Sequence, residues 1–447
     1  MQHKIGEYLF DSDRLIVYKG NVDQKTTILI DEVYSGSNTD NQAKLELEQH
    51  NADKMKMDRI ATDKIGICLT YNCNLRCNYC GYSSTNSDKN ELQFENIQAF
   101  IKDAIRKRAI RKLITKKNEP LQIYFTGGGE PTYNWKLFTK VVSYIRDVCS
   151  RNEVPLWLRM TSNGILRDEQ IGFISKNFNE LMISYDGLPE IQNTNRKGPG
   201  INDSNRIVEN TIRKISQNKV PLTIRSTMWQ GDYSKIKDMY HHVFSLVPTD
   251  SIVTWSVYPT LYEGRAIKGI TQEDYMNEFL SHYIELVNYV ISTEGEKKLN
   301  KIDVPLFNND LCGVFCGAYR NIHPWLLPDG SIVTCIESKD NAVRVGSVED
   351  GNIKYYDEYC DTFLKIAQEK YYTCRSCIAY RFCKGGCPVW HLRIGKKHNE
   401  AFECSLQKEY WGHVIQAALN GGYSFGWRLK ETSFVDDLGS PILKLIK

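Results

Sequence analysis

Between about residues 64 and 292, six short apolar runs alternate with six longer amphipathic stretches. The short runs are rich in β-branched and aromatic residues and lie at 65–69, 121–125, 155–160, 181–185, 221–227 and 252–257. The amphipathic stretches lie at 93–112, 134–149, 168–177, 203–217, 233–246 and 272–292. Strands that alternate with helices at this spacing form a parallel sheet with crossover helices. The sequence therefore predicts an α/β fold, a partial (β/α)6 TIM-like barrel.

Three cysteines follow the first apolar run, in the segment CNLRCNYC. Cys73, Cys77 and Cys80 have the spacing C-x3-C-x2-C. They are expected on a loop at the carboxyl end of a strand, where α/β barrels keep their active sites. Three thiolates can hold three irons of a [4Fe–4S] cluster and leave the fourth iron open for a substrate or cofactor. The pattern favours a catalytic cluster; a zinc knuckle or scattered thiols are the alternatives.

This spacing, with Tyr79 just before the last cysteine, resembles the cluster motif of the radical S-adenosylmethionine (radical SAM) enzymes. In that family the open iron chelates the amino and carboxylate groups of SAM. One electron then cleaves SAM to a 5′-deoxyadenosyl radical, which abstracts hydrogen from the substrate. The resemblance implies a [4Fe–4S] cluster on these three catalytic cysteines, SAM as cofactor, and the same partial barrel.

Several polar or glycine-rich segments at the ends of the predicted strands resemble the SAM contacts of that family. TGGGEP follows the second strand and matches the GGE segment, and Asn163 follows the third. The run SYDGLPEIQNTNR is similar to one in the subgroup that includes anaerobic sulfatase-maturating enzymes, in which the matching serine and arginine contact SAM. Asn163 and Arg225 are assigned to SAM from their place on the strands, and the other residues from the resemblance. The full set is Tyr79, Gly128, Gly129, Glu130, Asn163, Ser184, Arg196, Arg225 and Val257.

Each of these assignments has a simpler alternative. A glycine run is usually a turn, and Asn163-Gly164 is a common turn dipeptide. Arg196 could form an ordinary surface salt bridge, and Val257 could be a core valine. The resemblance covers residues 64–410 and adds weight to the functional interpretation.

A second set of cysteines follows residue 310. Cys316, Gly330 and Cys335 have the spacing C-x13-G-x4-C, and C-x2-C-x5-C-x3-C begins at Cys374. Together with Cys404 this resembles the SPASM extension of radical SAM proteins. By that resemblance, auxiliary cluster I is held by Cys312, Cys316, Cys335 and Cys387. Auxiliary cluster II is held by Cys374, Cys377, Cys383 and Cys404.

Eight thiols are the number that two fully ligated [4Fe–4S] clusters need, so three clusters are expected in all. Two zinc sites are the alternative, because C-x2-C pairs also suit tetrahedral zinc. Cys68 and Cys149 are expected in the core, since one lies in a predicted strand and the other in a predicted helix. Cys360 has no assigned role.

Length and composition limit the remaining possibilities. The 447 residues have room for a barrel at 61–300, a SPASM domain at 301–415, a tail at 416–447, and an extension at 1–60. Strands at 14–18 and 26–30 and a helix at 42–57 are expected in that extension. It is either a reduced leader-peptide-binding module or a cap on the barrel. The net charge of +3 is dispersed, so no nucleic-acid partner is expected.

No apolar run is long enough to span a membrane, and the first residues lack a signal-peptide pattern. A cytoplasmic protein without a membrane partner is therefore expected. An abundance of cysteines in a reducing compartment favours metal binding or catalysis over disulfides.

The sequence thus predicts a SPASM radical SAM enzyme that modifies a peptide or protein side chain. A flavodoxin or ferredoxin would donate the electron. Sulfatase maturation, which makes formylglycine, needs a general base, and those enzymes carry an aspartate directly after the cysteine that matches Cys335. Here that residue is Ile336, and an alternating strand would point Glu337 to the opposite face.

Maturation of a ribosomally made peptide, by a thioether or carbon–carbon cross-link, is therefore preferred. Formylglycine formation, a small-molecule dehydrogenation and a non-catalytic iron–sulfur electron-transfer scaffold are the alternatives.

Overall fold

The fold is known from a computed structural model of the 447-residue chain. The structure describes residues 2–5, 8–11, 16–19, 62–82, 84, 91–229, 231–260, 265, 272–294, 301–303, 323–337, 343–356, 366, 374, 377, 379, 383, 385–387, 389, 404–412 and 445–446. The chain divides into two compact units. Unit 1 comprises Met1–Ile60, Phe307–Arg320 and Phe363–Lys447; unit 2 comprises Ala61–Leu306 and Asn321–Thr362.

Unit 2 is built on a sheet in which six parallel strands follow one another in chain order. They are β4 (Lys64–Ile67), β5 (Leu121–Phe125), β6 (Leu156–Ser162), β7 (Glu180–Ser184), β8 (Leu222–Met228) and β9 (Val253–Pro259). All six lie within two residues of the predicted runs, and each pairs in parallel with the next. The predicted partial barrel is confirmed.

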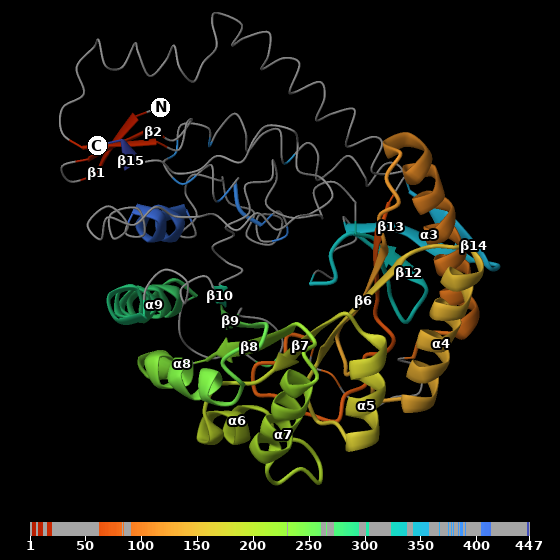
Figure 1. Ribbon diagram of the computed structural model, residues 1–447, viewed down its shortest axis with the longest axis horizontal. Coiled ribbons are helices and arrows are strands. Elements are labelled where there is room, and N and C mark those ends of the chain that lie inside the picture. Colours follow the sequence, from red (N-terminus) through yellow and green to blue (C-terminus); the bar gives the residue numbers. More distant parts are fainter. Residues whose placement is uncertain are drawn as a thin grey trace, which may run out of the picture. The chain divides into compact units, whose positions relative to one another are not determined.

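Helices connect these strands and cover the outer side of the curved sheet (Figure 1). They are α3 (Phe94–Thr115), α4 (Trp135–Arg151), α5 (Asp168–Asn177), α6 (Pro189–Asn195), α7 (Ser204–Gln217), α8 (Ile236–Ser245, after the 3-10 turn η2, Tyr233–Lys235) and α9 (Gln272–Glu294). The short helix α6 was not predicted. It begins with Pro189, a residue suited to the first turn, and too few residues follow to show a helical period.

The sheet continues beyond both ends of the barrel. β10 (Ile302–Asp303) pairs in parallel with β9, and β11 (Trp325–Leu326) pairs in parallel with β4. From β11 an antiparallel extension runs through β12 (Ser331–Val333), β13 (Arg344–Glu349) and β14 (Asn352–Tyr355). The sheet order is β10-β9-β8-β7-β6-β5-β4-β11-β12-β13-β14. Residues 325–355 thus join the barrel sheet, which the sequence pattern did not predict.

The core of unit 2 lies between the strands and their helices. Alternate residues of each strand face the helices, and on β5 these are Leu121, Ile123 and Phe125, all fully buried. Phe125 packs edge-to-face against Phe138 of α4. Cys68 and Cys149 are each about 1% exposed, which confirms their expected place in the core. The other face of each strand is thereby left to the barrel interior.

Unit 1 contains a small sheet formed by β1 (Gln2–Ile5), β2 (Tyr8–Asp11) and β3 (Ile16–Lys19), which are antiparallel. β15 (Leu445–Ile446) pairs in parallel with β3. β3 corresponds to the strand predicted at 14–18, whereas β1 and β2 were not predicted. The strand predicted at 26–30 and the helix predicted at 42–57 lie outside the described residues.

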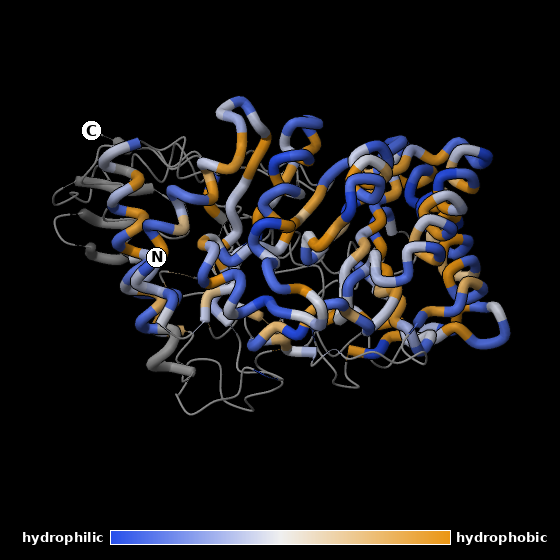
Figure 2. Tube along the Cα trace, turned by 90° about the horizontal axis from the view of Figure 1, so that it is seen from below, coloured by the Kyte–Doolittle hydropathy of each residue, from blue (hydrophilic) through white to orange (hydrophobic). Residues whose placement is uncertain are grey.

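Hydrophilic and hydrophobic residues alternate closely along the helices of unit 2 (Figure 2). In the part of the chain that the structure describes, no helix combines the length and the apolar character needed to cross a membrane.

Candidate active site

The loop that carries Cys73, Cys77 and Cys80 leaves the carboxyl end of β4 and lies against the end of α6. The amide of Arg76 donates to the carbonyl of Lys197 at 2.6 Å, and the amide of Asn78 donates to that of Asn195 at 2.9 Å. The Asn78 side chain adds a third bond, to the carbonyl of Thr194. Backbone hydrogen bonds to the fourth strand–helix unit therefore position this cluster loop.

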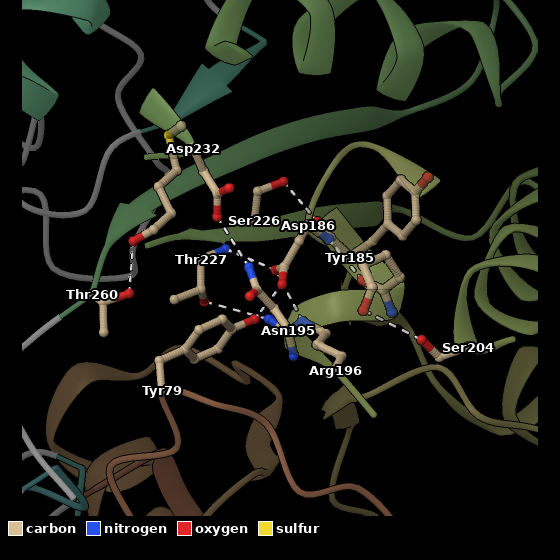
Figure 3. Close-up of polar contacts among 12 residues, drawn as sticks. Tyr79, Tyr185, Asp186, Asn195, Arg196, Ser204, Ser226, Thr227, Asp232 and Thr260 are labelled. Carbon is tan, nitrogen blue, oxygen red and sulfur yellow. Dashed lines mark hydrogen bonds and ion pairs between the residues drawn. The ribbon is translucent and has the colours of Figure 1, made fainter. Parts of the chain in front are cut away.

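A buried carboxylate joins the cluster loop to Arg196 (Figure 3). Asp186, which follows β7, has no exposed surface. It accepts a hydrogen bond from the Tyr79 hydroxyl, one from Arg196 Nε at 2.9 Å and one from the Thr227 amide at 3.2 Å. The Arg196 guanidinium also lies over the Tyr79 ring, 5.3 Å from its centroid. Tyr79 and Arg196, which the sequence assigned to SAM separately, therefore form one network.

A second buried carboxylate ties the ends of β5 and β6 together. Glu130 Oε1 accepts from the Thr132 amide and hydroxyl and from the Ser162 hydroxyl, and Oε2 accepts from the Asn163 amide at 2.7 Å. Burial raises the pKa of Glu130, and these donors oppose that rise. All four of these hydrogen bonds come from groups of the protein, so Glu130 holds the ends of β5 and β6 together.

The Asn163 amide group extends this connection to the first cysteine. Its Nδ2 donates to Asn74 Oδ1 at 2.6 Å and lies 3.6 Å from the sulfur of Cys73. Leu75 N also donates to that sulfur, at 3.4 Å. The end of β6 thus holds the start of the cluster loop.

The glycines of the TGGGEP segment allow it to lie directly against the cluster loop. A Cβ on Gly129 would lie 2.1 Å from the carbonyl oxygen of Asn72, and one on Gly128 would enter the rings of Tyr71 and Tyr82. Gly128 O accepts a hydrogen bond from the Ser84 hydroxyl. This close approach is the reason why the segment needs residues without side chains.

Ser184 and Arg225 occupy the barrel interior. They are register partners on β7 and β8, and Arg225 lies over the Tyr258 ring of β9. Val257 instead shares a face with Trp255, which contacts Tyr240 of helix α8. The structure makes Ser184 and Arg225 neighbours, and Val257 is fully buried, while its assignment to SAM stays a prediction.

Two of the three sulfurs of the cluster loop, those of Cys77 and Cys80, have arginine neighbours. Burial raises the pKa of Cys73 to about 12 and that of Cys77 to about 11, while Arg196 and Arg265 near Cys77 act in the opposite direction. Burial also acts on Cys80, but the Ser84 amide and the Arg265 guanidinium outweigh it, so the pKa of Cys80 is lowered.

Among the residues with described positions, no group of three or more His, Cys, Asp or Glu side chains could hold a single metal ion. A [4Fe–4S] cluster takes each thiolate on a different iron, so its ligands stand further apart than those of one ion. Three thiols on one loop, with amide and guanidinium donors beside their sulfurs, are a donor set that fits such a cluster.

The cysteines of the second set are described only in part. Cys312, Cys316 and Cys360 lie outside the described residues. Cys335 belongs to unit 2, and the remaining five belong to unit 1. None of the described cysteines forms a disulfide. The ligand sets of the two auxiliary clusters therefore stay a prediction. The described members from unit 1 are Cys374, Cys377, Cys383, Cys387 and Cys404.

The turn after β12 lies beside the cluster loop. The Tyr82 hydroxyl donates to the carbonyl of Ile336, and the charge of Glu337 contributes to a raised pKa of Tyr82, whose main cause is burial. The expectation that residues 336 and 337 continue an alternating strand is wrong. β12 ends at Val333 and a turn follows, so alternation does not separate the two side chains.

Comparison with known proteins agrees with this geometry. The model of the radical SAM superfamily matches residues 67–243, the span that carries the cluster loop, both buried carboxylates and Arg225. The chain contains a radical SAM domain.

Relatives of this radical SAM domain extend over most of the chain. A cysteine-type anaerobic sulfatase-maturating enzyme of Clostridium perfringens is 22% identical over 364 residues, covering 78% of this chain and 95% of its own. A solved structure of native anSMEcpe with bound AdoMet and a Cp18Cys peptide has a TM-score of 0.60 at 20% identity, covering 80% of this chain and 98% of its own.

Another solved structure is Streptococcus suis SuiB bound to the precursor peptide SuiA. It has a TM-score of 0.51 at 15% identity and covers 90% of this chain and 97% of its own. The chain thus contains a radical SAM domain, and its fold is similar to those of anSMEcpe and SuiB. The radical SAM domain implies SAM and a [4Fe–4S] cluster as cofactors.

Sequence reasoning gave no role to several residues of the radical SAM domain that the structure places beside the cluster loop. Asp186 was visible as a polar residue directly after an apolar run, at the edge where active sites lie. Thr227, Ser84 and Tyr82 carried no such signal, because their partners are distant in sequence.

Proposed function

We propose that the chain modifies a side chain of a ribosomally made peptide by forming a thioether or carbon–carbon cross-link. The observation that supports this choice is Ile336. Its side chain lies against the first glycine of TGGGEP, with Cδ1 3.1 Å from where a Cβ on Gly127 would be. A hydrocarbon side chain cannot take a proton at the position where sulfatase-maturating enzymes carry their aspartate. The substrate itself would then supply the nucleophile or the radical trap.

A [4Fe–4S] cluster on Cys73, Cys77 and Cys80 would supply the electron that cleaves SAM to methionine and a 5′-deoxyadenosyl radical. The chain's own residues orient and shield the reactants. Asp186 holds Tyr79 and Arg196 in place beside the cysteines. Ser184 and Arg225 present polar groups on the interior face, where a carboxylate or hydroxyl of SAM would find partners.

The partners of this reaction are proposed on chemical grounds. A peptide substrate is supported by the relatives, whose solved complexes contain the Cp18Cys and SuiA peptides. A reduced flavodoxin or ferredoxin would donate the first electron. The two auxiliary clusters would accept the electron left on the substrate, or bind a substrate thiolate. Residues 1–60 would capture a leader peptide, and β1, an edge strand of the small sheet, suits that purpose.

A second candidate, formylglycine formation on a sulfatase, is favoured by one observation. Glu337 follows Ile336 in the same turn and acts electrostatically on Tyr82 beside the cluster loop. A carboxylate in that turn would serve as the general base that the reaction needs. The named relative from Clostridium perfringens is a sulfatase-maturating enzyme, which agrees with this alternative.

The experiment that tests the radical chemistry uses protein purified without oxygen and reduced with dithionite. Wild type is compared with a Cys73→Ala/Cys77→Ala/Cys80→Ala variant for iron, sulfide, zinc and deoxyadenosine. About twelve irons per chain, about four fewer in the variant, and no deoxyadenosine from the variant are expected for three clusters. Zinc on the second cysteine set, or deoxyadenosine production that survives in the variant, would refute the assignment. A loaded wild type that never cleaves SAM would be a non-catalytic scaffold.

Mass spectrometry then distinguishes a cross-linked peptide from formylglycine as the product. A short peptide encoded beside the gene should lose two hydrogens and resist cleavage across the new bond. A cysteine peptide with a sulfatase maturation sequence should remain free of aldehyde. An aldehyde that forms on this peptide and disappears in Glu337→Gln would decide for the second candidate. Asp329→Asn changes an acidic residue of the same extension and serves as the control.

A further inference from the structure

Arg265 lies against the last cysteine of the cluster loop. Its backbone amide donates to the carbonyl of Cys80 at 3.2 Å. The positive charge of its guanidinium acts to lower the pKa of the Cys80 and Cys77 thiols, against the effect of burial. A residue far away in sequence therefore places a fixed positive charge beside two of the three sulfurs.

The guanidinium of Arg265 has hydrogen-bond donors without a partner among the described residues. Its Nε and Nη2 atoms are buried and have no hydrogen-bond partner within the described part of the chain. Burying an unpaired charge costs several kcal/mol, so such a group is expected to meet an anion that the protein alone does not provide.

The other two arginines near the loop are already engaged. Arg196 is paired with Asp186, and Arg76 donates to the carbonyls of Cys73 and Leu75. Of these three arginines, Arg265 is the one whose buried donors have no partner among the described residues. Two anions could fill that position, the sulfur atoms of the cluster or the carboxylate of SAM. The contact with Cys80 favours the cluster.

We propose that Arg265 donates hydrogen bonds to the sulfurs of the [4Fe–4S] cluster at the Cys80 corner and raises its reduction potential. This inference rests on the proposed cluster at the three cysteines. Adding one electron makes the cluster more negative, so a nearby cation stabilises the reduced form more than the oxidised form. Hydrogen bonds to the sulfurs and net charge are known determinants of such potentials. Arg265 would make the cluster reducible by a physiological donor.

The test is a redox titration of the cluster followed by electron paramagnetic resonance on the anaerobically loaded full chain. Arg265→Gln removes the charge and keeps a polar side chain. At the wild-type midpoint potential its ratio of reduced to oxidised cluster is expected to fall about tenfold, which corresponds to a shift of about 59 mV to more negative values. Arg265→Lys should recover part of that shift. Arg159→Gln, which removes an interior arginine paired with Glu180, should leave the potential unchanged.

Three further results separate the possibilities. Arg265→Gln with full iron content and the wild-type potential would overturn the proposal. Weaker SAM binding at an unchanged potential would also overturn it and would assign Arg265 to the SAM carboxylate. Wild type that binds no iron at the three cysteines would instead refute the proposed function.

A variant that fails to load iron does not end the test. Wild type labelled with ¹⁵N-arginine should then show guanidinium nitrogen coupled to the reduced cluster in pulsed resonance spectra. The absence of that coupling would refute the proposal.

Discussion

Replacing Asp186 by Asn should expose the energetic role of the buried network. The substitution keeps the size of the side chain and removes the charge that pairs with Arg196 at 2.9 Å. Arg196 is 6% exposed, so its guanidinium would remain buried without a counterion. Breaking a buried pair in this way costs about 3–5 kcal/mol. The Tyr79 hydroxyl would also lose a charged acceptor.

Native-state hydrogen exchange with mass spectrometry measures this cost locally, which suits a chain too large for a single two-state transition. Each 1.4 kcal/mol is a factor of ten, so protection of peptides covering β7 and α6 should fall roughly one hundred-fold to a few thousand-fold. The double variant Asp186→Asn/Arg196→Met removes both charges and should cost less than the sum of the single changes.

The matched control is Asp147→Asn. Asp147 pairs with Arg151 at 2.6 Å, but both side chains are more than half exposed. Exposed pairs contribute less than about 1 kcal/mol, so protection of α4 should change by less than about fivefold. If Asp186→Asn lowers protection by no more than the control does, Arg196 does not depend on this carboxylate and the network is not what holds the loop.

Two other changes probe the same end of the barrel. Gly129→Ala would place a methyl group 2.1 Å from the Asn72 oxygen and push the cluster loop aside, so iron per chain after reconstitution should fall. The control is Gly172→Ala, whose methyl group would meet nothing within 4 Å and which should load iron fully. Equal loading of both variants would contradict the close approach. Burial raises the pKa of Asp232 to about 6, although a hydrogen bond from Asn195 opposes this rise. Between about pH 4 and 6 the folded state therefore keeps a proton on Asp232 that the unfolded state has lost. The stability of the folded state should therefore decrease as pH rises from about 4 to 6. Asp232→Asn should remove that slope from a plot of melting temperature against pH. An unchanged slope would show that another group causes it.

The barrel was predictable because each strand has a buried face, which gives a continuous apolar signal, and each helix is long enough to show its period. The extension β11–β14 was not, because β11 and β12 have only two and three residues and the strand that joins the extension to the barrel, β4, lies far away in sequence. β11 has two residues, and what identifies it as a strand is its pairing with β4.

Some residues of the candidate site were likewise predictable from the sequence, and their contacts were not. The cysteines and glycines follow spacing rules, so the sequence located them. Asp186 stood in the quoted SYDG run, but no local rule shows that its partners are Tyr79 and Thr227, at distances of 107 and 41 residues along the chain. The turn after Cys335 was mistaken for a strand because an alternation of side chains was assumed beyond Val333. Contacts between distant segments decide these details, and periodicity does not record them.

The bonds between the cluster loop and the end of α6 have a consequence for damage and repair. Cys73, Cys77 and Cys80 lie on backbone that the protein itself holds, through Arg76, Asn78 and neighbouring residues. Oxygen that strips iron from such a loop would leave the ligands where they were. Reloading would then require only iron, sulfide and a reductant, without refolding of the chain, and an enzyme inactivated by air could return to use in the cell that made it.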